Sequence, residues 1–233
     1  LLTRLKDGLD RKEQTAPPKP AKVISRETDI VPPFVGVVIG TSTGGPPTLI
    51  QIFQNIPENT KAAFYIVQHG PPWMLETFSQ RLQRETKLKV SLAMNNTISE
   101  TGNIYLAPGD KHLRIEPGTL KIKLDSGPKE NFVRPAADPL FRSAGEAFGK
   151  YCIGVVLTGL GRDGAQGAAQ IVSNQGTLLV QDPETAVAPS MPKTVIEAGV
   201  KHKLVPLDDF GKALAETIFP IAGRLKQHNN DKS

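Results

Sequence analysis

The stretch Phe34–Gly45, FVGVVIGTSTGG, decides the fold that the sequence predicts. Its first half is a short run of Val and Ile, long enough for a buried strand and too short for an isolated helix. Its second half is rich in glycine, and the apolar periodicity of residues 49–53 follows it. Pro46 and Pro47 fall near the first turn of that last segment, where a missing N–H costs nothing. The stretch therefore predicts a strand, a glycine turn and a helix, in that order.

Ser42 lies in the glycine turn between Gly40 and Gly44, in a G-x-S-x-G pattern. Such a turn can hold a serine hydroxyl at the carboxyl edge of a sheet, beside a helix N-terminus that stabilises negative charge. The same pattern is frequent by chance, and glycines of this kind can also make a plain tight turn or bind a phosphate through their N–H groups. A nucleophile and an anion-binding loop are therefore both open at this point.

Short apolar runs and helical patterns alternate along the rest of the chain. Strands are expected at 62–67, 90–94, 103–107, 151–157 and 177–181, and helices at 74–84, 139–150, 165–172, 193–198 and 207–219. This alternation predicts an α/β fold, a doubly wound and mostly parallel sheet flanked by helices. Asp138 stands where it could cap the helix that starts at Pro139.

One segment breaks the alternation. Residues 112–115 and 120–124 each alternate apolar and polar side chains on either side of Pro117-Gly118. Period-two alternation across a Pro-Gly turn is typical of a β-hairpin with one buried face. An antiparallel hairpin is therefore expected at one edge of the sheet.

The domain organisation follows from composition. Leu1–Arg11 has helical apolar spacing, and 12–33 is a linker rich in proline (Pro17, Pro18, Pro20, Pro32 and Pro33). Residues 34–222 are expected to form one domain, a size that suits a single core. Residues 223–233 are expected to be a polar tail.

Composition also limits the class of protein. The chain has 233 residues, of which 39% are hydrophobic and 22% are charged, as is usual for a globular protein. Its single cysteine, Cys152, cannot form an intramolecular disulfide, so a reducing, cytoplasmic location is expected. The chain contains no run of about 18 apolar residues, so the sequence predicts no membrane-spanning helix. The net charge of +5 comes with little aromatic interleaving, so nucleic acid is not an expected partner.

Three of the expected strands lead into loops that carry Ser42, His69 and Asp163. Because the carboxyl ends of parallel strands meet at one edge of a sheet, these side chains are expected to lie close together. They are the residue types of an acyl-transfer triad, in which serine attacks, histidine takes its proton and a carboxylate orients the imidazole. Taken singly, His69 could be a loop or core histidine, and Asp163 could cap the following helix.

The histidines elsewhere predict no metal site. His112, His202 and His228 have no Cys, Asp or Glu at ligand spacing, and they are interpreted as strand or surface residues. The order Ser, His, Asp along the chain also differs from the Ser, Asp, His order of α/β-hydrolases.

Six segments in order resemble the catalytic domain of the CheB family, the chemotaxis protein-glutamate methylesterases. They are IGTSTGGPP, IVQHGPP, IYLAPGDKHL, RPAADPLFRSA, VVLTGLGRDGAQG and VQDPETAVAPSMPKTVIEAG, and they span about Val35–Gly199. The resemblance implies that Ser42 is the nucleophile, that His69 is the general base and acid, and that Asp163 orients His69. It also implies an oxyanion hole from the backbone N–H groups at Thr43 and at Leu160, a position where the family often has methionine.

The resemblance also implies substrates and partners. Family members hydrolyse glutamyl methyl esters on the helical bundles of chemoreceptors and can deamidate glutamines there, with no metal or organic cofactor and no membrane insertion. Leu1–Arg11 resembles the last helix of a receiver domain, the target of a histidine kinase, and 12–33 resembles the linker that follows it. Two other functions remain as alternatives, a phosphate- or nucleotide-binding module and a non-catalytic receptor-docking protein of the same fold.

Overall fold

The computed structural model describes the backbone of residues 31–230 and the side chains of residues 31–227. Leu1–Arg11 and most of the 12–33 segment lie outside the described residues. The helix remnant and the linker therefore stay predictions.

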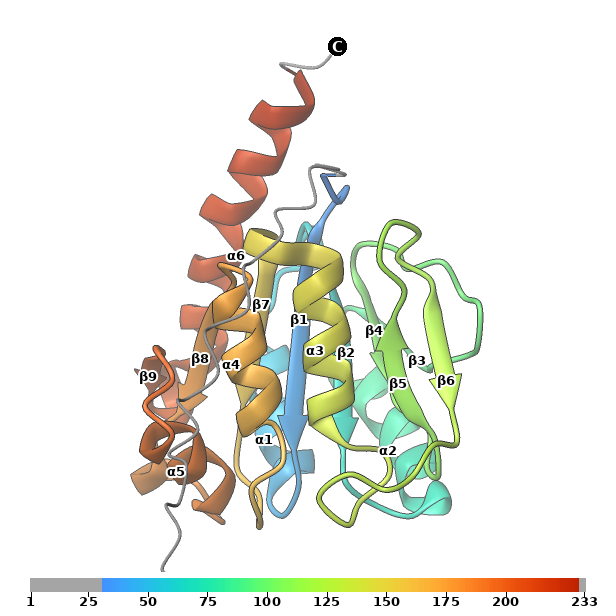
Figure 1. Ribbon diagram of the computed structural model, residues 1–233, viewed down its shortest axis with the longest axis vertical. Helices are drawn as coiled ribbons and strands as arrows, with labels where there is room; N and C mark the ends of the chain where they lie inside the picture. The colour runs from blue at the N-terminus through green and yellow to red at the C-terminus, as the bar shows by residue number, and fades with distance from the viewer. Residues whose placement is uncertain (1–30, 231–233) are drawn as a thin grey trace, which may run out of the picture.

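In the described part of the chain, seven parallel strands form the central sheet (Figure 1), in the order β3-β4-β2-β1-β7-β8-β9. They are β1 (Val35–Thr41), β2 (Ala62–Gln68), β3 (Lys89–Leu92), β4 (Asn103–Leu106), β7 (Cys152–Val156), β8 (Thr177–Gln181) and β9 (Lys203–Val205). The doubly wound sheet that the sequence predicts is confirmed. Only β9 was not expected, because a strand of three residues is too short to show a periodicity.

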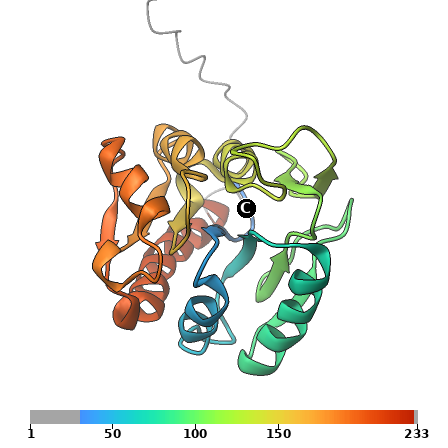
Figure 2. The same ribbon diagram turned by 90° about the horizontal axis from the view of Figure 1, so that it is seen from below.

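Helices cover both faces of the sheet, which lies between two layers when viewed along the strands (Figure 2). One layer consists of α1 (Gly45–Phe53), α2 (Pro72–Glu85) and α6 (Leu207–Asn230), and the other of α3 (Ala137–Phe148), α4 (Ala165–Ser173) and α5 (Ser190–Glu197). Two short 3-10 turns, Gly149–Tyr151 and Pro183–Thr185, complete the list of helical elements in the described range. None of the helices described is both long enough and apolar enough to cross a membrane.

The central strand β1 determines how closely α3 packs. Its odd-numbered residues Val35, Val37 and Ile39 face the α1 and α6 layer, and its even-numbered positions face α3. Two of those even positions are Gly36 and Gly40, and a Cβ at Gly40 would lie 2.7 Å from the Cβ of Ala137. The missing side chains let the first turn of α3 approach the carboxyl end of β1.

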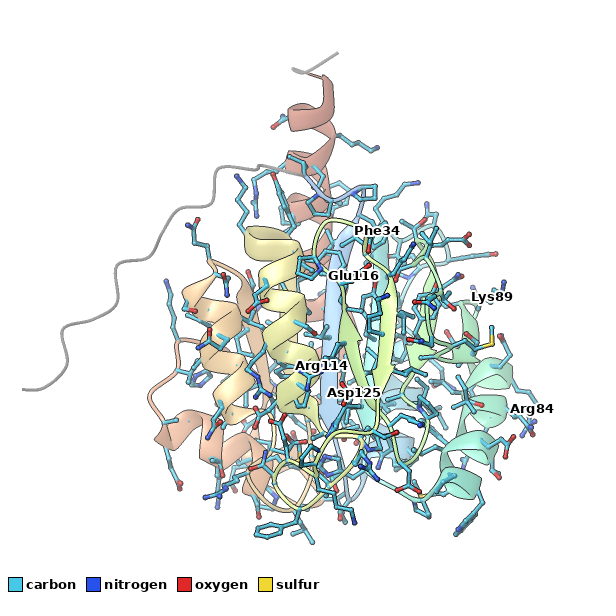
Figure 3. All side chains as sticks on the ribbon, turned by 45° about the vertical axis from the view of Figure 1, so that its right-hand side comes forward. Phe34, Arg84, Lys89, Arg114, Glu116 and Asp125 are labelled. Carbon is cyan, nitrogen blue, oxygen red and sulfur yellow. The ribbon has the colours of Figure 1, made fainter. Side chains whose placement is uncertain are left out.

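The predicted hairpin is present as β5 (His112–Ile115) and β6 (Ile122–Asp125), which pair antiparallel. It forms a second, two-stranded sheet whose apolar side chains join the core on the α3 side, so it covers a face of the main sheet and adds no strand to its edge. On its polar side, Arg114 and Asp125 form an ion pair at 2.7 Å, and Figure 3 shows both on the hairpin.

Two helices differ from the sequence-based expectation. α5 begins at Ser190 rather than at Lys193, and α6 continues through Pro220 to Asn230, where the sequence predicts a helix end at Phe219. Proline usually ends a helix because it lacks the N–H that bonds one turn back. Here the apolar face continues beyond it, and Leu225 is only 3% exposed. Part of the predicted polar tail is therefore helix packed on the core.

Leu225→Ala should lower the free energy of unfolding by about 2–3 kcal/mol, because a buried side chain is removed from a packed interface. Urea denaturation measures the difference. Lys226→Ala, at the exposed neighbouring position, is the matched control and should change stability by less than about 0.5 kcal/mol. Equal stability of Leu225→Ala and the wild type would contradict the packing of this part of α6.

Candidate active site

The three candidate residues lie at adjacent strand ends. Ser42 directly follows β1, His69 directly follows β2, and Asp163 lies in the loop between β7 and α4. β1 has β2 on one side and β7 on the other, and the chain winds outward in both directions from this point. A parallel sheet is open to a ligand at such a point, beyond the carboxyl ends of its strands. These ends lie at the bottom of Figure 1.

The register places Ser42 beside His69. Thr41 pairs with Gln68 as the last pair between β1 and β2, so Ser42 and His69 are the next residues in line. The His69 N–H donates to the Thr41 carbonyl at 3.1 Å, which continues the ladder by one bond. Neighbouring strands are about 4.8 Å apart, so the two side chains leave the sheet as close neighbours.

His69 and Asp163 are in direct contact. His69 Nε2 lies 2.7 Å from Asp163 Oδ2, and the two side chains are 11% and 2% exposed. When the neutral ring donates from Nε2 to the carboxylate, Nδ1 is the nitrogen left to accept a proton. The pair therefore has the arrangement of a general base and the carboxylate that orients it.

The Asp163 carboxylate accepts four hydrogen bonds, two on each oxygen. Oδ2 receives the His69 ring and the Ala137 N–H at 2.6 Å, and Oδ1 receives the Asp138 N–H at 3.1 Å and the Asn131 amide at 3.0 Å. The two backbone donors are unpaired N–H groups in the first turn of α3, where the helix dipole favours negative charge. Asp163 thus caps α3 rather than the helix that follows it, whose N-cap is Gly164.

These contacts set the charge of Asp163. Burial, the largest single influence, would raise the pKa of this carboxyl group. The hydrogen bonds from His69 and from the α3 backbone outweigh it, and the pKa lies below its usual value. The site therefore holds a carboxylate rather than a carboxylic acid beside His69.

Asp138 does not have the predicted role of N-cap. The cap position of α3 is Ala136, and the Asp138 side chain, 1% exposed, points to α4 and accepts the Gly167 N–H at 2.7 Å. The capping acceptor comes from Asp163 in a distant loop, which local sequence cannot reveal. Burial, aided by the nearby charge of Asp163, raises the pKa of Asp138.

Asn131 is a site residue that sequence analysis missed. Its amide nitrogen donates to Asp138 Oδ2 at 2.8 Å and to Asp163 Oδ1 at 3.0 Å, so both of its N–H groups are used. One amide thereby separates and satisfies two buried carboxylates. An asparagine in a polar loop has no distinguishing spacing, and only its place just before the RPAADPLFRSA segment marks it in the sequence.

The backbone around Ser42 is held by two neighbouring strands. The Gln68 side chain donates to the Ser42 carbonyl at 3.0 Å, and the Ser42 N–H donates to the Thr158 carbonyl at 3.0 Å. A Cβ on Gly159 would lie 2.8 Å from the Ser42 Cβ, so this glycine is needed for the close approach. Among the described residues, no hydrogen bond involves the Ser42 hydroxyl; the bonds here use its backbone.

Thr43 and Leu160, the two expected oxyanion donors, lie on the loops at either side of Ser42. Both residues are exposed, and neither backbone N–H donates a hydrogen bond within the described part of the chain. Both groups are therefore available to a ligand oxygen. The structure brings all five sequence-predicted site residues to one edge of the sheet.

The profile of the CheB methylesterase family matches residues 37–214. The chain belongs to this family. It is 40% identical over 195 residues to a protein-glutamate methylesterase/protein-glutamine glutaminase of Pyrococcus abyssi. This match covers 83% of this chain and 53% of the relative. It is 37% identical to the protein-glutamate methylesterase FrzG of Myxococcus xanthus, over 89% of this chain and 61% of the relative. The chain thus spans about half to two thirds of the length of these curated CheB relatives.

The fold agrees with a solved CheB structure. The catalytic domain of the Thermotoga maritima CheB methylesterase superposes with a TM-score of 0.76 at 38% sequence identity. The match covers 79% of this chain and 99% of the solved domain. Almost all of the solved domain thus has a counterpart in this chain.

Asp163→Asn should destabilise the protein at pH 7 by about 1–3 kcal/mol, because a buried charged acceptor is lost. The pKa of Asp163 in the folded state lies below the unfolded value of about 3.9, so the carboxylate stabilises the fold above that pH. This contribution is lost as the pH falls through the folded-state pKa. The stability gap between wild type and variant should therefore narrow below about pH 4 in urea titrations.

The matched control for this titration is Asp110→Asn. Asp110 is exposed and has a positive φ of 57°, a conformation that asparagine adopts readily. The free energy of unfolding of Asp110→Asn should equal that of the wild type at every pH. A gap between wild type and Asp163→Asn that stays constant down to pH 3 would contradict the lowered pKa.

Proposed function

We propose that this chain is a serine hydrolase that removes methyl groups from glutamyl methyl esters on proteins. The observation that carries the proposal is the His69–Asp163 hydrogen bond of 2.7 Å, formed at strand ends next to Ser42. Membership of the CheB family supports the same activity, since the relatives are named protein-glutamate methylesterases.

In the first step, Ser42 Oγ attacks the ester carbonyl carbon while His69 Nδ1 takes the hydroxyl proton. The N–H groups of Thr43 and Leu160 donate to the oxyanion of the tetrahedral intermediate. The intermediate collapses when the C–O bond to the methoxy group breaks. His69 returns its proton to that oxygen, and methanol leaves.

The second step releases the glutamyl side chain. Water attacks the acyl carbon and His69 takes its proton. The bond to Ser42 Oγ breaks, and His69 returns the proton to that oxygen. In both steps the negative Asp163 stabilises the imidazolium form of His69 and keeps the ring in position. Two backbone N–H groups and the Asn131 amide keep Asp163 itself in place.

Deamidation of protein glutamine would use the same groups. The substrate is then an amide, His69 protonates the leaving nitrogen, and ammonia replaces methanol as the product. The name of the Pyrococcus abyssi relative, protein-glutamate methylesterase/protein-glutamine glutaminase, supports this second reaction.

We place the substrate on the cytoplasmic helical bundles of methylated chemoreceptors. The name of the family and of its relatives, together with the position of the site beyond the carboxyl ends of the strands, supports a protein substrate. In a longer form of the protein, an upstream receiver domain phosphorylated by a histidine kinase would regulate the enzyme.

Ser42→Ala should abolish methanol release from a methylated receptor cytoplasmic fragment, with kcat lowered by about 10³-fold or more. Removal of the nucleophile leaves only binding and the oxyanion donors. Ser173→Ala, an exposed serine on α4, is the matched control and should retain the wild-type rate. A Ser42→Ala variant with wild-type turnover would refute the proposed mechanism.

Asn131→Gly should lower kcat by about ten- to hundredfold with little change in KM, because Asp163 loses one of the donors that position it. Glycine suits the positive φ of 51° at this position, so the backbone of the turn is retained. Initial rates over a range of ester concentrations separate the two constants. A rise in KM alone would assign Asn131 to substrate binding.

A further inference from the structure

The turn next to the candidate site presents an exposed aromatic side chain. Phe132 is 90% exposed and has a φ of +66°, and Asn131 before it has a φ of +51°. Glu130 and Val133 close the turn by exchanging two backbone hydrogen bonds, at 3.2 and 3.0 Å. Two central residues with positive φ are the pattern of a type I′ turn.

The backbone of this turn favours glycine at the place where Phe132 stands. Type I′ turns prefer Asn-Gly, and a bulky residue with positive φ is strained. An exposed ring also buries little apolar surface, so Phe132 gains little from core packing. Neither the backbone conformation nor core packing therefore favours phenylalanine at this position. A residue that keeps a strained backbone conformation points to a functional role.

The turn is fixed on both sides, so the backbone of Phe132 is held in place next to the site. Before Phe132, both carboxylate oxygens of Glu130 accept from Arg142 of α3 at 2.7 Å. Directly next to Phe132, the Asn131 amide donates to Asp163, the partner of His69. Phe132 is thus one residue away from the hydrogen-bond network that holds His69.

Other exposed apolar side chains lie around the same edge. Of the large apolar residues that the described range exposes, four belong to the loops and helix starts at the carboxyl ends of the strands: Trp73, Phe132, Leu160 and Val187. Leu160 follows Gly159, which packs against Ser42, and Val187 contacts the Gly44 position. Apolar groups therefore flank Ser42 on one side and His69–Asp163 on the other. Such clustering is typical of a contact surface for another protein.

We propose that Phe132 is a specificity-determining residue that packs against the helix carrying the ester. The inference rests on the proposed function. An ester on a helical side chain has neighbours three and four residues away on the same face, one turn up or down. A side chain on a turn that is hydrogen-bonded to the Asp163–His69 pair is placed to meet those neighbours. Phe132 thus selects helices with an apolar residue one turn from the modified glutamate.

The test compares a protein ester with a small ester. Phe132→Gly should raise KM for a methylated receptor cytoplasmic fragment by about tenfold or more, since the contact surface of an aromatic side chain is lost. Its kcat/KM for N-acetylglutamate γ-methyl ester should stay within about twofold of the wild type, because this substrate has no neighbouring helical residues. Its melting temperature should not fall, because glycine suits the turn.

Two variants serve as controls. Phe132→Tyr keeps an aromatic ring and should keep KM for the receptor fragment near the wild-type value. Phe219→Ala removes an equally exposed ring from α6, away from the site, and should leave both substrates unaffected.

Each other outcome has a definite meaning. If Phe132→Gly matches the wild type on the receptor fragment, or loses activity on both substrates equally, the specificity role is wrong while the proposed function stands. If Phe219→Ala raises KM as much, the effect is not specific to the turn and the inference fails. If the wild type hydrolyses neither ester, the proposed function fails and the inference fails with it.

Discussion

The arrangement of the site depends on the carboxylate of Asp163. This one group caps α3, accepts from the His69 ring and receives the Asn131 amide, so it joins a helix, a strand end and a turn that are distant in sequence. Its burial would favour the neutral acid, and the hydrogen bonds from His69 and from the α3 backbone reverse that preference and lower the pKa. The charge next to His69 thus follows from the way in which the first turn of α3 is satisfied. The same hydrogen bonds that close the fold at this edge also keep a charged carboxylate against the His69 ring.

That carboxylate could not reach α3 without the glycines of β1. Gly36 and Gly40 place no side chain at two of the β1 positions that face α3, so the helix lies close to the strand there. Its N-terminus therefore lies at the carboxyl edge, where β2, β1 and β7 end side by side. A Cβ at Gly36 would collide with the Phe148 ring, and a Cβ at Gly40 would lie 2.7 Å from the Ala137 Cβ, in the turn whose N–H groups bind Asp163. The packing of α3 against β1 therefore also fixes the contact between the first turn of α3 and Asp163 at the edge of the sheet.

The loops at this edge contrast with the core in what they expose. The sheet buries most of its apolar residues on both faces, whereas Phe132, Leu160 and Val187 remain in contact with solvent around the site. The strained backbone of Phe132 belongs to the same edge. Exceptions of this kind to the usual rules of folding are expected at a functional surface.

The sequence by itself determined the alternation of strands and helices, the central Phe34–Gly45 unit and the positions of Ser42, His69 and Asp163 at strand ends. These properties depend on hydrophobic periodicity and glycine turns, which are local. The roles of Asp138 and Asn131, the length of α6 beyond Pro220 and the separate hairpin sheet were decided only by the tertiary structure. Asp138 has the spacing of an N-cap, but Asp163 occupies that role from a loop 25 residues away. Partners so far apart in the chain leave no periodic pattern, because a hydrogen bond between two loops depends on where the whole fold places them.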